Sequence, residues 1–143
     1  MRALQPIVLI GVLGASTVSA VAYCDSRPTV EQEFKTSAVV CIGKVTDARE
    51  VAVRSQSVTG GTFYSIEVVE VLKGGASRSL QLYSERSSGR FPMQVGVQYL
   101  IFAESGTFEG ISGQQLGVNS CGNSAPLPKG HKTLETVRRL RKA

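Results

Sequence analysis

The stretch Val39-Val40-Cys41-Ile42-Gly43-Lys44-Val45-Thr46 is the first strong β-strand signal in the sequence. Its first four residues are all apolar, and strands of this composition are covered on both faces. Gly43 interrupts the apolar run, and a glycine inside a strand is typical of a bulge or a sharp bend. The stretch therefore predicts a bent strand that is buried on two sides.

Further strands are predicted downstream by apolar runs and by the alternation of apolar and polar residues. In the first of them the alternation slips by one residue between Val68 and Val69, which is what a β-bulge produces. The predicted strands cover residues 62–72, 79–84 and 97–103, and a final pair covers residues 108–111 and 116–120.

A helix is predicted on each side of the strands. Residues 28–36 form a short helix in which Thr29 and Gln32 make a capping box. Residues 133–142 form a C-terminal helix with Thr133 as its N-cap and with Leu134 and Val137 on its inner face. The pattern predicts a mainly β fold, a five- to six-stranded OB-fold-like closed barrel with a short N-terminal helix and a C-terminal helix. A β-sandwich is the main structural alternative.

The N-terminus has the layout of a cleaved signal peptide. Met1-Arg2 is a short basic region, residues 7–13 are apolar, and small residues follow. A membrane span needs roughly 20 apolar residues, so this run is short for one, and an uncleaved anchor is the alternative. We expect residues 1–22 to be a signal peptide, cleaved after Ala20 or Ala22. Residues 23–143 then form one secreted or periplasmic domain.

Three cysteines bear on the fold, because export exposes the chain to an oxidising compartment where thiols pair. Cys41 lies in an apolar run, so it is predicted to be a buried, reduced side chain. Cys24 and Cys121 remain as the disulfide pair. In the chain-entropy model, closing so long a loop contributes roughly 4–5 kcal/mol to stability.

The formal net charge of +5 is concentrated at the C-terminal end. Such a patch can hold an anionic lipid, a cell-wall polymer or an acidic protein, and the alternative is a solvated outer face of a packed helix. The candidate anion patch consists of Lys132, Arg138, Arg139, Arg141 and Lys142.

Catalytic and cofactor chemistry finds little support in the sequence. The sole histidine, His131, stands among lysines, so no Ser-His-Asp set can be assembled around it. No His, Cys or carboxylate cluster has the spacing of a metal site. We therefore predict a protein that is not an enzyme and has no cofactor or metal. Aromatic residues could stack on bases as in many OB-folds, but a packed core explains their spacing and export argues against a nucleic-acid partner.

The order of motifs resembles the tissue-inhibitor-of-metalloproteinases (TIMP) and netrin-module (NTR) family, and its short bacterial members in particular. The matching stretches are Phe34 with residues 39–45, residues 64–74, residues 96–103, and residues 119–121 with 125–127. This resemblance implies an exported OB-fold domain. In the family, the cysteine that matches Cys24 pairs with the cysteine that matches Cys121.

The sequence departs from the family at its mature N-terminus. Inhibitory members begin with Cys-x-Cys, and the first cysteine coordinates the zinc ion of the target protease through its amine and carbonyl. Here the matching residues are Ala22-Tyr23-Cys24, so that first cysteine is missing. Its disulfide partner, expected in residues 84–94, is missing as well.

Three functions follow from these observations. We predict an exported, non-enzymatic protein-binding module that contacts its partner through Tyr23 and Cys24 at the mature N-terminus. The first alternative is a metalloprotease inhibitor that acts through the same terminus. The second is a module that binds polyanions or the cell envelope through its basic C-terminal helix.

Overall fold

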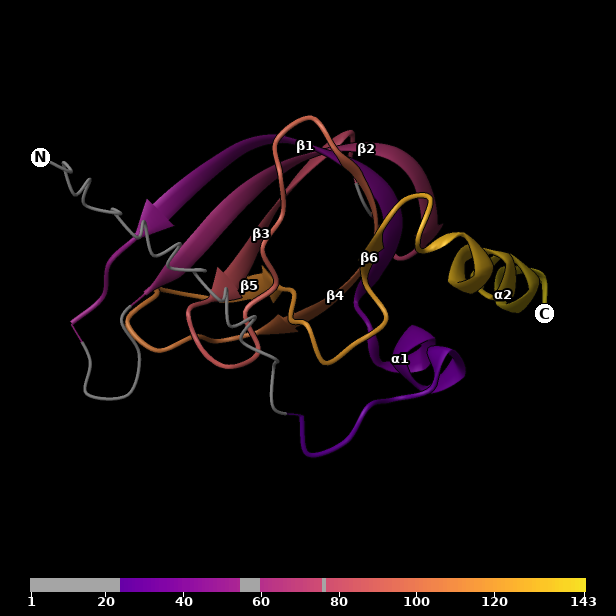
Figure 1. Cartoon of the computed structure of the whole chain (residues 1–143), viewed down its shortest axis with the longest axis horizontal. Helices are drawn as coiled ribbons and strands as arrows, with labels where there is room; N and C mark the ends of the chain where they lie inside the picture. Colours follow the sequence, from indigo (N-terminus) through magenta and orange to yellow (C-terminus); the bar gives the residue numbers. More distant parts are fainter. Residues whose placement is uncertain (1–23, 55–59, 76) are drawn as a thin grey trace, which may run out of the picture.

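The computed structural model describes residues 24–54, 60–75 and 77–143. The predicted signal peptide, its two candidate cleavage sites and Tyr23 lie outside the described residues. The described part is mainly β, with two helices, as the sequence predicts (Figure 1). In chain order the elements are α1 (Val30–Thr36), β1 (Val39–Val51), β2 (Gly61–Lys73), β3 (Ser79–Glu85), β4 (Gln98–Gly106), β5 (Gln115–Gly117), β6 (Ala125–Pro126) and α2 (His131–Lys142).

The strands form one sheet whose hydrogen bonds run around a closed ring. The strand order is β1-β2-β3-β5-β4-β6, and β1 also pairs with β4. All of these pairs are antiparallel except β3 with β5, which are parallel. The ring closes because β1 has a neighbour on both of its edges.

β1 can pair with both neighbours because the strand bends at Gly43, as the sequence predicts. The partner of Ile42 on β2 is Glu70, whereas the partner of Gly43 is Val68, so Val69 is the extra residue of a bulge. Gly43 has no room for a side chain at this bend. A Cβ atom there would lie 2.3 Å from Cγ2 of Ile66 and 3.2 Å from Cδ1 of Ile101.

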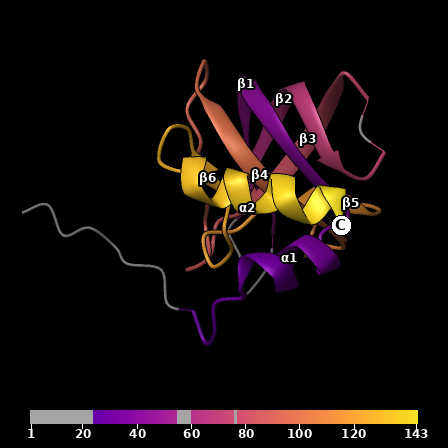
Figure 2. The same ribbon diagram turned by 90° about the vertical axis from the view of Figure 1, so that its right-hand side faces the viewer.

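Apolar side chains pack on both faces of β1 and β4. The cluster inside the ring contains Val39, Cys41, Val45, Tyr64, Ile66, Leu82, Met93, Tyr99, Ile101, Ala103 and Val118. The cluster outside it contains Val40, Ile42, Leu72, Leu100, Phe102, Leu134 and Val137. The two helices lie side by side against this outer face (Figure 2). The double burial predicted for residues 39–42 is therefore confirmed.

The short helix α1 is fixed at both ends. The predicted capping box is present, with Thr29 and Gln32 each bonding the backbone N–H of the other. At the other end, Nζ of Lys73 donates to the carbonyls of Phe34, Lys35 and Ser37 at 2.6, 2.7 and 2.8 Å. One ammonium group thus satisfies three carbonyls near the end of the helix, which have no partner within it.

Two details of the sequence prediction are wrong. α2 begins at His131 with Gly130 as its N-cap, and no side chain caps it, so Thr133 is not the cap. The backbone explains the earlier start, since the N–H of Gly130 bonds to the carbonyl of Pro126 and that of His131 to the carbonyl of Pro128. The chain is already turning before Thr133.

The final pair of strands is the second error. Residues 108–111 form a turn, closed by a bond from the N–H of Ile111 to the carbonyl of Phe108. Gly110 within it has a φ of 75°, a conformation that favours glycine. β5 covers only Gln115–Gly117 and lies between β3 and β4.

Gly43→Ala tests the bend of β1. The added methyl group meets Ile66 and Ile101, so we expect the free energy of unfolding to fall by about 1–3 kcal/mol. Gly75→Ala is the matched control, because a Cβ atom at Gly75 meets nothing within 4 Å. Urea unfolding of the purified proteins measures both. Equal stabilities of the two variants would contradict the tight approach at Gly43.

Candidate functional site

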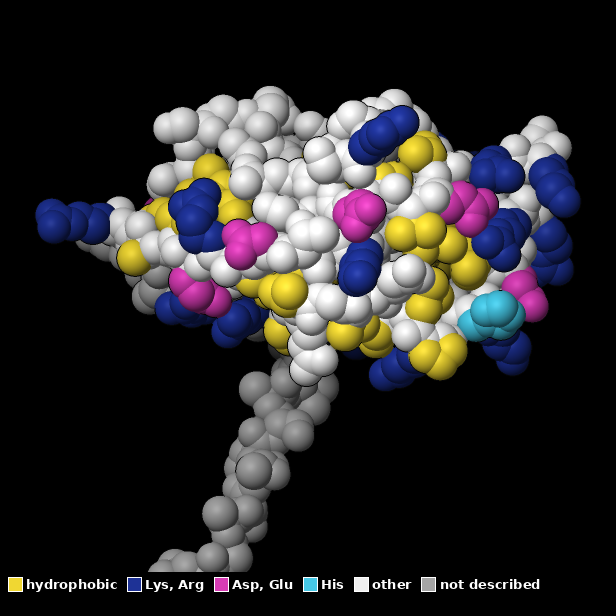
Figure 3. Space-filling view, turned by 90° about the horizontal axis from the view of Figure 1, so that it is seen from above, with side chains coloured by type: hydrophobic (Ala, Val, Ile, Leu, Met, Phe, Trp, Pro, Cys, Tyr) yellow, Lys and Arg dark blue, Asp and Glu magenta, His cyan; other side chains and the backbone are white. Residues whose placement is uncertain are grey.

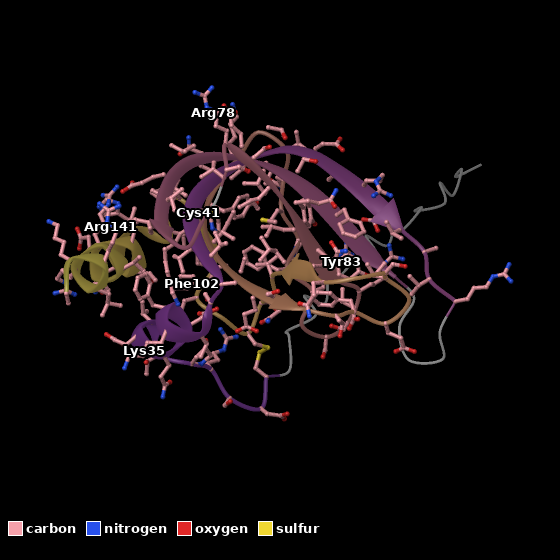
Figure 4. The ribbon with its side chains drawn as sticks, turned by 180° about the vertical axis from the view of Figure 1, so that it is seen from behind. Lys35, Cys41, Arg78, Tyr83, Phe102 and Arg141 are labelled. Atoms are coloured by element: carbon pink, nitrogen blue, oxygen red, sulfur yellow. A yellow bond between two sulfur atoms is a disulfide. The ribbon has the colours of Figure 1, made fainter. Side chains whose placement is uncertain are left out.

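The disulfide predicted from the sequence is present. Cys24 and Cys121 are bonded, with their Cα atoms 5.7 Å apart, and so tie the start of the described chain to the loop after β5. Cys41 is a free thiol buried inside the ring (Figure 4). Burial raises the pKa of the Cys41 thiol to about 12. A thiol in such surroundings stays protonated and inert, which supports a packing role for Cys41.

A buried carboxylate makes a second connection next to the disulfide. Oε2 of Glu33, on α1, accepts hydrogen bonds from the backbone N and from Nδ2 of Asn123, each at 2.6 Å. Nδ2 of Asn123 also donates to the carbonyl of Pro28 at 3.2 Å. Gly122 leaves the space for this contact, because a Cβ atom there would lie 2.0 Å from Oε1 of Glu33.

Glu33 titrates above its ordinary range. Burial of its carboxyl is the main cause of the raised pKa, and the nearby Glu104 adds to it, while the two bonds from Asn123 act in the opposite direction. Burial therefore disfavours the charged form of this carboxyl group, and the hydrogen bonds from Asn123 partly offset that penalty. From the sequence alone, Glu33 reads only as an acidic residue that favours the first turn of a helix.

A third segment of the chain, residues 86–90, lies next to the disulfide. The N–H of Ser120 donates to the carbonyl of Gly89 at 2.8 Å, and Oδ1 of Asn119 accepts from the N–H of Cys121 at 2.9 Å. Residues 24–33, 86–90 and 119–123 thus meet, although they are far apart in the sequence. We call the surface that these three segments form the disulfide surface. Of the two predicted contact residues, the structure places Cys24 on this surface, and Tyr23 lies outside the described residues.

The predicted anion patch lies on α2, and all five of its side chains are exposed. Lysine and arginine side chains gather over this helix in Figure 3. The structure divides them into two groups. Arg138 and Arg141 reach Glu70 on β2, with N···O distances of 2.8 and 3.4 Å, and Arg141 also bonds to the carbonyl of Val71. Within the described part of the chain, Lys132, Arg139 and Lys142 form no ion pair.

His131 lies at the start of α2 with its side chain exposed. Its Nε2 is 3.6 Å from a carboxylate oxygen of Glu135, one helical turn further on. Across residues 24–54, 60–75 and 77–143, no group of three His, Cys, Asp or Glu side chains is placed to hold a metal ion. No helix in these ranges is both long and apolar enough to cross a membrane.

Comparison with known proteins gives no family for this chain. No family model matches the sequence, and no curated protein is significantly similar to it.

Glu33→Gln tests the buried carboxylate, because it keeps an acceptor oxygen for Asn123 and removes the charge. The pKa of Glu33 is raised above 4.5 in the folded state, so above pH 4.5 the folded protein binds more protons than the unfolded chain. The contribution of Glu33 to stability is therefore lost as the pH rises through this window. We expect the stability of the wild type to fall relative to that of Glu33→Gln between pH 4.5 and neutral pH.

Urea unfolding at several pH values measures this difference. Glu31→Gln is the matched control, since it removes an exposed carboxylate from the same turn of α1. A difference between wild type and Glu33→Gln that stays constant with pH, or grows in favour of the wild type, would contradict the desolvation of Glu33.

Proposed function

We propose that this chain is an exported, non-enzymatic protein-binding module with an OB-fold-like closed barrel of the TIMP/NTR type. The strand ring β1-β2-β3-β5-β4-β1 supports this fold, as do the bend in β1 and the bulge in β2. A disulfide is typical of proteins in oxidising compartments, which agrees with export. The partner is a protein rather than a nucleic acid.

The disulfide surface is the observation that carries the proposal. A covalent bond, a buried carboxylate and a backbone hydrogen bond fix three segments there. Each connection restricts the conformational freedom of the surface before a partner binds. A surface that is already ordered loses less entropy when the partner docks.

Metalloprotease inhibition is the alternative at the same place. It requires the amine of the mature N-terminus to reach a zinc ion, and Ala22 stands where the family has the cysteine that holds this amine. Mass-spectrometric mapping of the mature terminus discriminates the two functions. A mature chain that begins at Val21 would carry its amine too far from Cys24 to coordinate zinc as the family does.

A charge reversal next to the disulfide tests the proposed binding surface. Asp25 is exposed and adjacent to Cys24, so we expect Asp25→Arg to weaken the binding of the protein's partner about tenfold or more. The partner is isolated from the extracellular or periplasmic fraction with the wild-type protein as bait, and its affinity is then measured by calorimetry. Asp47→Arg, an identical change at an exposed position of β1, is the control. Equal affinities of the two variants would place the contact elsewhere.

A second candidate function is favoured by the three cations of α2 that form no ion pair with any described residue. Lys132, Arg139 and Lys142 are exposed and free to meet an anionic envelope surface, whereas Glu70 partly neutralises Arg138 and Arg141. A basic residue near an anionic membrane contributes about 1 kcal/mol to binding. Such binding weakens as salt screens the charges.

Glu70→Gln tests this second function, because it releases Arg138 and Arg141 from their carboxylate. We expect about fivefold tighter binding to phosphatidylglycerol vesicles for each cation released, and loss of binding at high salt. Glu67→Gln is the control, since it changes the net charge equally on the same strand and, in the described part of the chain, Glu67 forms no ion pair with either arginine. Vesicle binding that is indifferent to salt, or equal in the two variants, would exclude α2 as the contact.

A further inference from the structure

A small hollow opens on the surface next to the disulfide surface. Its volume is about 230 Å³, and it lies on the outside of the strand ring, where β3, β5 and β4 are neighbours. Three of its residues, Ser87, Gly89 and Asn119, belong to the disulfide surface. Its walls include Glu85, Ser87, Gly89, Glu104, Phe108 and Asn119, and several of these are exposed, so solvent can enter.

The hollow exists because β5 carries a glycine at its end. Gly117 pairs with Tyr83 on one side and with Glu104 on the other, so one row of side chains across three strands has a gap in its middle. The ring of Phe108 fills the inner part of the gap, since a Cβ atom on Gly117 would lie 2.3 Å from its Cζ atom. Phe108 also packs edge-on against the buried ring of Tyr83, with centroids 5.0 Å apart. One wall of the hollow is therefore a fixed aromatic ring.

The charge of the hollow is negative. Among the described residues that line it, Glu85 and Glu104 are the two charged ones, and none is a lysine or an arginine. The nearest arginines in sequence, Arg86 and Arg90, are both paired with Glu50. In the described part of the chain, neither Glu85 nor Glu104 has an ion-pair partner.

We propose that this hollow binds one basic side chain, an arginine or a lysine, of the partner protein. Two carboxylates attract the cation and accept its N–H groups, and the face or edge of Phe108 packs against its apolar stem or its guanidinium plane. Oδ1 of Asn119 has a second lone pair free after its bond to Cys121. A volume of about 230 Å³ is smaller than most ligand pockets, roughly 300–1,000 Å³, and suits a single side chain.

The inference rests on the proposed function, because it states which kind of side chain the partner of the disulfide surface presents. The hollow and that surface share a wall, because the N–H of Ser120 bonds to the carbonyl of Gly89, which lines the hollow. A partner that docks on the disulfide surface can therefore place a protruding side chain in the hollow at the same time.

Titration of the ¹⁵N-labelled protein with N-acetyl-arginine amide tests the hollow without any partner. We expect saturable shifts of the amide signals of Phe108, Val118 and Asn119. N-acetyl-citrulline amide, which has the same shape and no charge, should leave these signals in place. Glu85→Gln with Glu104→Gln should weaken arginine binding about tenfold, because charge-assisted hydrogen bonds are lost. Asp47→Asn with Glu67→Gln is the charge-matched control at exposed positions outside the hollow and the disulfide surface.

A second variant fills the hollow instead of removing its negative charges. Gly89→Leu adds a side chain where a Cβ atom meets only ordinary contacts, 3.7 Å from Ser87 and 3.8 Å from Asn119, so the fold should persist. We expect this variant to keep a dispersed spectrum and to lose the arginine-induced shifts.

Three results would overturn the inference. These are equal shifts with the citrulline probe, an unchanged affinity for arginine in the double glutamine variant, and arginine shifts that persist in a folded Gly89→Leu protein. The outcome is separate from that of the proposed function. If Asp25→Arg weakens partner binding while the hollow variants have no effect in either assay, the protein-binding function stands and the hollow does not contribute.

Discussion

The pairing of β1 with both β2 and β4 is the constraint on which the rest of the structure depends. One strand has two neighbours, so the sheet closes on itself and β1 is paired along both edges over residues 40–44. This arrangement requires a bend, which Gly43 permits by having no side chain and Val69 completes as the extra residue of a bulge. Closure also divides the apolar residues of β1 and β4 between an inner cluster and an outer one. The outer cluster then needs a cover, which the two helices provide.

The N-terminal helix is attached by contacts of different physical kinds. The bond between Cys24 and Cys121 reduces the conformational entropy of the unfolded chain, because it closes a loop with a sequence separation of 97 residues. The bonds from Asn123 to Glu33 act only in the folded state, where the carboxylate is desolvated and needs its donors. Lys73 satisfies carbonyls at the far end of α1 and joins that end to β2. Together these contacts hold a short helix that would be marginal alone.

Charges of opposite sign are separated on the molecule. The hollow beside the disulfide surface carries Glu85 and Glu104, and none of its described lining residues is basic, whereas α2 carries five exposed cations, of which Arg138 and Arg141 pair with Glu70. Separated charges of this kind steer the approach of a partner more than they add to affinity. The two proposed contacts, a protein at the acidic side and an anionic surface at α2, therefore use different parts of the molecule and do not compete for the same residues.

Local sequence determined the features that depend on neighbouring residues. The apolar run at residues 39–42, the change of phase at Val69 and the capping box of Thr29 with Gln32 are all written in short stretches, and the structure has each of them. The disulfide could also be assigned, because the burial of Cys41 left only one pair.

The short β5 and the start of α2 at His131 could not be predicted, since they depend on where distant strands and turns place the backbone. Only the tertiary structure brought Asn123 to Glu33, Lys73 to the end of α1, and Glu85 and Glu104 to one hollow around Phe108. These contacts join residues far apart in the chain, and no local pattern of apolar and polar residues encodes which of them will meet.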